Sequence, residues 1–311
     1  MTLTASTLIL HEFAISPFAE KARLMLGYKG LAWSGVMVPL VMPKPDVIAL
    51  TGGYRRTPSL QIGADIYCDT ALIAMVLERL QPMPTLYPAS APLAPQLAQW
   101  ADTSLFAAAV PWAMQPAGAA VMLAGMADDD KRALVADRAA MANGMRRLSV
   151  VDAGTQLRRH LRAIDVQLAD GRKFLFGAEA TIADFSVAHC LWFVHTGIAP
   201  AVVFEPHPKL KGWLQRMFDF GHGQRTPISS AEAIKIAAAS TSHAPVQVAP
   251  GLGYEAGMLV TAAATDYGVD PVTGTLVGLD ETSMTLRRTD DRAGTVHVHF
   301  PRASFHLKLE K

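Results

Sequence analysis

The hydrophobic residues of roughly the first 80 positions switch between strand-like and helix-like spacing. Short apolar runs predict strands, whereas Phe18, Ala22, Met25 and Leu26 recur at the spacing of a helix. Ser16-Pro17 opens that helix, because serine is a favoured cap and proline suits the first helical position. The predicted order is strand, helix, strand, helix, strand, strand, helix. The ranges are 8–13, 17–26, 33–41, 46–50, 59–62, 66–68 and 71–80.

Prolines punctuate residues 81–95 and mark a domain boundary. Helical spacing then continues to about residue 240. The predicted helices are 92–109 and 112–124, as one kinked helix or two, then 128–143, 152–170, 182–194, 208–220 and 229–239, the last two completing a bundle. Residues 182–194 are apolar on most faces, so this helix should be central. Thr181 and Asp184 resemble a capping box, which gives Asp184 a structural role rather than a catalytic one.

After a Pro/Gly-rich linker the pattern becomes strand-like, with five predicted strands at 258–265, 275–279, 283–288, 295–300 and 304–309. Val296, Val298 and Phe300 alternate with His297 and His299, which indicates a half-buried strand. The two histidines could ligate a metal, but no third ligand is evident, so we interpret them as solvent-facing and predict no metal site. The segment would be only marginally stable alone, so we expect a small barrel-like module or a sandwich packed against its own chain, serving stability or assembly.

Three domains follow from these boundaries: 1–82, 90–240 and 254–311. The predicted fold is a multi-domain α/β, all-α and small all-β protein. Half of the residues are hydrophobic, 50%, and 18% are charged, which excludes a disordered chain. The net charge of +1 makes nucleic acid and anionic membranes poor partners. No signal-peptide pattern is seen, and Cys68 and Cys190 fall in buried elements, so a cytoplasmic protein with free thiols is expected.

Residues 55–70 carry the first functional indication. Thr57-Pro58 precedes a strand, where a cis bond would turn the Thr57 backbone out of the sheet toward a ligand. Asp69-Thr70 stands at a helix N-terminus, where it offers acceptors for an ammonium group and donors for a carboxylate. A free amino-acid end would meet both charges there.

Four segments together carry a family resemblance: SPFAEKARLML after the first strand, TPSLQ, CDTALI and ATIADFSVA. In type and spacing they resemble soluble glutathione transferases, with a thioredoxin-like first domain and an all-helical second domain. The resemblance covers roughly three quarters of the chain and says nothing about the last β segment. One departure is the acid-hydroxyl pair, commonly Glu-Ser or Gln-Ser in the family and Asp69-Thr70 here.

The resemblance implies a homodimeric enzyme that uses glutathione as co-substrate and transfers it to small electrophiles. It implies that Ser16 stabilises the thiolate, although Ser16 could also be a helix cap and nothing more. Asp69 and Thr70 would hold the γ-glutamyl end, and Thr57, before Pro58, the cysteinyl amide. Candidates for the glycyl carboxylate are Arg55, Arg56 and Lys44, and candidates for the electrophile pocket are Trp112 and Met114. The alternative is a non-catalytic binding or adaptor protein that interacts through its β segment.

Overall fold

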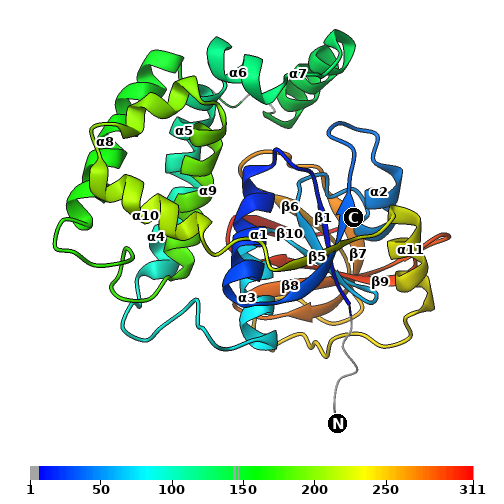
Figure 1. The fold of residues 1–311 in the computed structure, drawn as a ribbon. Helices are drawn as coiled ribbons and strands as arrows, with labels where there is room; N and C mark the ends of the chain where they lie inside the picture. The colour runs from blue at the N-terminus through cyan, green and yellow to red at the C-terminus, as the bar shows by residue number, and fades with distance from the viewer. Residues whose placement is uncertain (1–6, 143–144, 146, 311) are drawn as a thin grey trace.

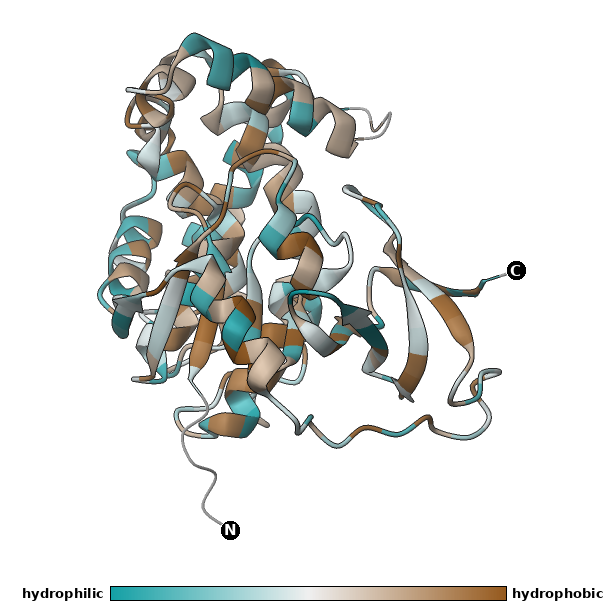
Figure 2. Ribbon diagram, turned by 90° about the vertical axis from the view of Figure 1, so that its right-hand side faces the viewer, coloured by the Kyte–Doolittle hydropathy of each residue, from teal (hydrophilic) through white to brown (hydrophobic). Residues whose placement is uncertain are grey.

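A computed structural model describes residues 7–142, 145 and 147–310. It consists of a large twisted sheet with flanking helices and a helical bundle beside it (Figure 1). The side view of Figure 2 shows hydrophobic and hydrophilic residues interleaved along both the helices and the strands. This interleaving is what amphipathic elements around shared cores require.

The N-terminal part has the element order that the sequence predicts. β1 pairs with β2 in parallel and with β3 antiparallel, and β3 pairs antiparallel with β4, as in a thioredoxin-like domain. The elements are β1 (Leu8–Glu12), α1 (Pro17–Tyr28), β2 (Ala32–Met37), α2 (Pro45–Thr51), β3 (Ser59–Ile62), β4 (Asp65–Cys68) and α3 (Thr70–Leu80).

The helical part surrounds α9, which is buried along most of its length, as predicted. The Thr181–Asp184 capping box is present at its start. No single described helix is long and apolar enough to cross a membrane, and one bent pair, 94–113 with 116–122, passes that test by length and composition alone. The elements are α4 (Ala94–Trp100), η1 (Ala101–Leu105), α5 (Phe106–Ala113), α6 (Pro116–Met122), α7 (Asp128–Ala142), α8 (Val150–Gln167), α9 (Ile182–Thr196), η2 (Ala199–Phe204) and α10 (Pro208–Phe218).

The chain then returns to the sheet, and the prediction that residues 229–239 complete the bundle is wrong. β5 (Gln224–Pro227) pairs in parallel with β2. α11 (Ser230–Ala239) packs against α2, where Ala233 joins a core with Ile9 and Val47 (Figure 1). The amphipathic pattern of residues 229–239 predicted the helix correctly, but it cannot say which apolar surface covers it.

The last five strands are present, as predicted, and they extend the N-terminal sheet. They are β6 (Leu259–Ala264), β7 (Val272–Leu279), β8 (Ser283–Asp290), β9 (Gly294–Pro301) and β10 (Phe305–Leu309). β9 pairs in parallel with β4, which gives one ten-stranded sheet in the order β10-β6-β7-β8-β9-β4-β3-β1-β2-β5. Because β10 pairs with β6 and lies at the end of this order, the described strands form an open sheet instead of a closed barrel.

Strand β9 corrects the interpretation of its two histidines. Val296, Val298 and Phe300 are buried, as the alternation predicts. His299 is buried too, with 4% of its surface exposed, and the side chain of His297 is 12% exposed. The solvent-facing interpretation is therefore wrong, because Tyr67 of β4 stacks on His299 and His243 of the linker stacks on His297.

Candidate active site

Ser16 caps α1 and faces the loop before β3. Its hydroxyl accepts a hydrogen bond from the Ala19 amide at 3.1 Å and donates to the Thr57 carbonyl at 3.4 Å. Figure 1 shows α1 between the bundle and the sheet, so Ser16 lies at the junction of the two parts. The positive end of the helix dipole and a hydroxyl donor are thus combined at one point, an arrangement suited to stabilising an anion.

The Thr57-Pro58 bond is cis, as predicted. Pro58 leads into β3, and the Thr57 carbonyl faces the Ser16 hydroxyl at the start of α1. The structure therefore brings together Ser16 and Thr57, two residues that are 41 positions apart in the sequence.

Asp69 and Thr70 form the N-terminus of α3, also as predicted. The Asp69 carboxylate accepts from the Ala71 amide at 2.8 Å, and Asp69 has a positive φ of 73°, which is rare for a residue other than glycine. Such strain, of about 1–3 kcal/mol, concentrates at functional sites. Burial raises the pKa of Asp69, and the Ala71 amide with the charges of Lys21 and Arg56 offsets part of that rise.

The three basic residues predicted to meet a carboxylate already have partners within the chain. Arg55 pairs with Asp137 of α7 at 2.5 Å, and Arg56 pairs with Asp266 in the loop between β6 and β7. The Lys44 ammonium donates to the Arg55 carbonyl at 3.3 Å. Burial and the charge of Arg138 lower the pKa of Lys44 to about 8.

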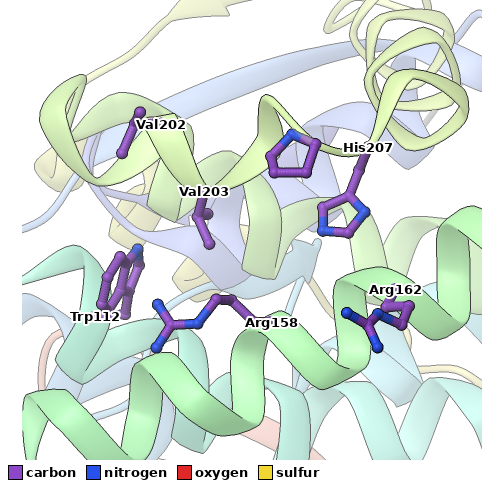
Figure 3. Close-up of a pocket in the computed structure, with 7 residues that line it drawn as sticks. Trp112, Arg158, Arg162, Val202, Val203 and His207 are labelled. Atoms are coloured by element: carbon purple, nitrogen blue, oxygen red, sulfur yellow. The ribbon is translucent and has the colours of Figure 1, made fainter.

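Trp112 lines a pocket of about 340 Å³ within the helical bundle. In Figure 3, Trp112 lies beside Arg158 of α8, and Val203 and His207 lie across the pocket from Arg158 and Arg162. None of the residues predicted to bind glutathione lines this pocket. Met114 follows α5 directly and packs against the main hydrophobic core.

Sequence reasoning missed the aromatic side chains next to Ser16. Phe18, two residues further along the chain, packs against Phe106 of α5 with ring centroids 4.8 Å apart, and against His189 of α9 with centroids 4.6 Å apart. Both phenylalanines are partly exposed. Their helical spacing was readable, but the meeting of α1 with α5 and α9 was not.

A buried ionic network behind these rings was also missed. The Lys21 ammonium lies 2.6 Å from Asp102 of η1, and His189 lies 2.9 Å from the other oxygen of the same carboxylate. Burial raises the pKa of Asp102, but the Lys21 charge and the His189 hydrogen bond outweigh it and hold the pKa at about 2. This network ties α1, and with it Ser16, to the bundle.

Comparisons with known proteins match two parts of the chain to one family. Residues 10–85 match the model of the glutathione S-transferase N-terminal domain, and residues 135–216 that of the C-terminal domain. No curated protein matches the chain.

Solved structures extend the match. A GST-like protein from Pseudomonas syringae is 42% identical, covers 98% of this chain and 100% of its own, and superposes with a TM-score of 0.81. A glutathione S-transferase from Rhodospirillum rubrum covers 68% of this chain and 88% of its own at 22% identity and a TM-score of 0.53. Rice GST1, solved with glutathione, covers 73% and 92% at 19% identity and a TM-score of 0.50, so both share the fold. The chain belongs to the glutathione S-transferase family.

Proposed function

We propose that this protein binds glutathione, stabilises its thiolate with Ser16 and transfers it to small electrophiles. The observation that carries the proposal is the Ser16 hydroxyl, held between the first turn of α1 and the Thr57 carbonyl. The hydrogen bond from the Ser16 hydroxyl to the Thr57 carbonyl is long, 3.4 Å. A thiolate is a stronger acceptor than a carbonyl, so the Ser16 hydroxyl can donate to a bound thiolate instead. The rice relative, solved with glutathione, supports the choice of ligand.

The remaining contacts are assigned by pairing the charged and polar groups of glutathione with residues of the site. Asp69 and Thr70 would hold the γ-glutamyl ammonium and carboxylate at the N-terminus of α3. The Thr57 backbone would pair with the cysteinyl amide and leave the sulfur near Ser16. Phe18 and Phe106 would supply an apolar surface for the electrophile, in place of Trp112.

The glycyl carboxylate would have to compete with carboxylates of the chain itself. Asp137 and Asp266 already pair with Arg55 and Arg56. Lys44, by contrast, donates to a neutral carbonyl, so its ammonium has no such competitor among these contacts. We therefore favour Lys44 for the glycyl end.

A second candidate function is that of a glutathione-binding or fold-only adaptor. The ion pairs of Arg55 and Arg56 favour it, because they tie the first domain to α7 and to the loop between β6 and β7. An adaptor needs such fixed geometry and needs no activated thiol.

A titration with glutathione followed by the ultraviolet absorbance of the thiolate separates the two candidates. A transferase should lower the thiol pKa of bound glutathione by about two units, equivalent to roughly 2.7 kcal/mol of preference for the anion. Binding that leaves the thiol protonated near neutral pH would favour the adaptor. Absence of binding would contradict the assignment of Asp69 and Thr70.

The proposal also includes an oligomeric state and a cellular location. We propose a homodimer, in line with the family resemblance. We also propose a cytoplasmic location, which the two buried free cysteines, Cys68 and Cys190, support because free thiols persist in reducing compartments.

A further inference from the structure

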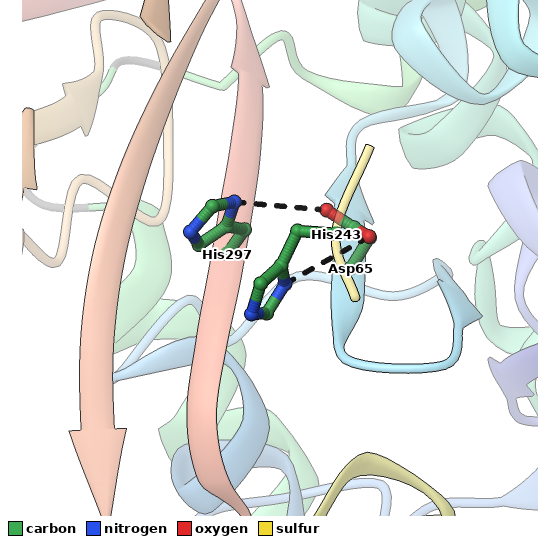
Figure 4. Close-up of side chains that lie close together, drawn as sticks. All are labelled: Asp65, His243 and His297. Atoms are coloured by element: carbon green, nitrogen blue, oxygen red, sulfur yellow. Dashed lines mark ion pairs between the residues drawn. The ribbon is translucent and has the colours of Figure 1, made fainter. Parts of the chain in front are cut away.

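Three side chains from distant parts of the sequence meet where β9 joins the N-terminal sheet. Asp65 begins β4, His297 is its direct partner on β9, and His243 comes from the linker that follows α11. Figure 4 shows both imidazoles turned toward the Asp65 carboxylate. Each Nδ1 atom lies 3.9 Å from a carboxylate oxygen, Oδ2 for His243 and Oδ1 for His297.

Among the residues that the structure describes, neither of these two nitrogens has a hydrogen-bond partner, although both are buried. The two rings stack with their centroids 3.8 Å apart and 15° between their planes. Buried imidazole nitrogens are normally paired, because an unpaired buried polar atom loses its hydration without compensation. Two of them directed at one carboxylate form a donor set that suits a single shared cation.

Other residues hold the Asp65 carboxylate in place through hydrogen bonds. His299 lies 2.7 Å from Asp65 Oδ1 through Nε2, and its Nδ1 lies 2.9 Å from the Thr285 hydroxyl. The Ala244 amide donates to Asp65 Oδ2 at 2.9 Å. Groups that orient ligands in this way surround metal ions in proteins and contribute to the affinity.

We propose that Asp65, His243 and His297 bind a divalent transition-metal ion. One ligand atom from each residue lies within 4.8 Å of the others. A tetrahedral zinc ion with bonds of about 2.1 Å holds its ligand atoms roughly 3.4 Å apart, so the ligand atoms have to approach one another by about 1 Å. The two stacked imidazoles also have to turn out of their parallel arrangement, because an imidazole nitrogen binds a metal in the plane of its ring. Two imidazoles and one carboxylate suit zinc and its neighbours in the series better than calcium or magnesium, which prefer oxygen ligands.

The ion would link three segments of the chain and stabilise their arrangement. It would fix the linker across β4 and β9, at the line where the five C-terminal strands meet the thioredoxin-like domain. This role is separate from the proposed glutathione chemistry, since none of the three ligands is among the residues assigned to glutathione.

The test uses the untagged chain of 311 residues after removal of metals, in the absence of glutathione, whose thiol would bind the probe ions. We expect one equivalent of Co²⁺ to give visible ligand-field absorption that Zn²⁺ abolishes, with a dissociation constant for Zn²⁺ at or below roughly 1 µM. His297→Ala and His243→Ala should each weaken binding by at least roughly 100-fold. Zn²⁺ should raise the Tm of the wild type and leave that of His243→Ala unchanged.

His195→Ala is the matched control, because His195 is an exposed histidine of α9 in the bundle and its loss should change nothing. His243→Ala keeps the test valid if His297→Ala fails to fold, since His243 lies in the linker outside the sheet. Absence of a one-equivalent site in the wild type would overturn the proposal. So would retention of that site in His243→Ala.

Discussion

In the part of the chain that the structure describes, three serines cap helices with the same hydrogen bond. Ser16, Ser149 and Ser229 each accept from a backbone amide three residues ahead at 3.1 Å. Ser16 also donates to the Thr57 carbonyl. Ser16→Ala should therefore lower glutathione conjugation at least about tenfold, equivalent to about 1.4 kcal/mol of lost thiolate stabilisation.

Ser229→Ala is the control for capping alone and should cost about 1 kcal/mol of stability without changing the turnover of the folded protein. The two variants are compared by initial rates and by Tm. If Ser16→Ala conjugated as fast as Ser229→Ala, Ser16 would be a cap and nothing more.

Asp184 illustrates a carboxylate whose role is structural. It accepts hydrogen bonds from the Leu175 amide at 2.8 Å, the Thr181 amide at 2.9 Å and the Trp213 indole at 2.9 Å. Asp184→Ala leaves these buried donors without a partner and should cost at least about 2 kcal/mol in urea unfolding. Asp152→Ala, at the exposed start of α8, should cost less than about 1 kcal/mol. A fully stable but inactive Asp184→Ala protein would contradict this role.

Lys44 gives a pH-dependent prediction. Its pKa of about 8 in the folded protein lies below the value of about 10.4 expected for the unfolded chain. Between these values the unfolded state holds a proton that the folded state has lost, so the Lys44 contribution to the free energy of unfolding rises with pH. The rise should reach about 3 kcal/mol at most.

The measurement is the difference in unfolding free energy between the wild type and Lys44→Met, from about pH 7 to pH 10. The difference should move in favour of the wild type as the pH increases. A difference that stays constant would place the pKa of Lys44 near its ordinary value.

At the scale of elements, the pairing of β9 with β4 decides what the C-terminal strands do. A chain ending at Ser240 would lose β6–β10 and expose the β4 edge together with Ile66, which β9 covers. We expect a lower Tm and self-association in gel filtration, because unpaired edges bind other strands. Glutathione binding should persist, since Ser16, Thr57 and Asp69 remain.

Val298→Pro provides a milder version of that experiment. Val298 lies opposite Ile66, and proline cannot donate to the strand ladder. This variant should shift Tm in the same direction as the truncation. Truncated protein that kept its stability and assembly but lost turnover would instead place the segment in the active site.

Most elements could be predicted from the sequence, because their signals are local: the caps at Ser16 and Thr181, the helical spacing of α8 and α9, and the alternation in β9. β5 gave no such signal, since all four of its residues are exposed. The glutathione residues were assigned through the family resemblance. Their partners Asp137 and Asp266 were not, because side-chain pairing across roughly 80 to 210 positions depends on packing that spacing does not encode.

At the scale of the whole molecule, the family resemblance predicts a homodimer. In this structure the β4 edge is paired with β9 of the same chain, so a dimer has to use other surfaces of the sheet domain and the bundle. Sedimentation at micromolar concentration should give twice the chain mass of 33.4 kDa. A monomer at that concentration would count against the prediction.

The ten-stranded sheet also has a consequence for the synthesis of the protein. Strands β1 to β4 are translated first. The edge of β4 stays unpaired until β9 is made, because Asp65 of β4 pairs with His297, roughly 230 residues later in the chain. At about 5–20 residues per second, the ribosome needs roughly 10 to 50 s to supply that partner. Throughout that interval the nascent thioredoxin-like domain carries an open edge, so its yield in the cell should depend on how fast the remaining chain emerges and on how crowded the neighbouring ribosomes are.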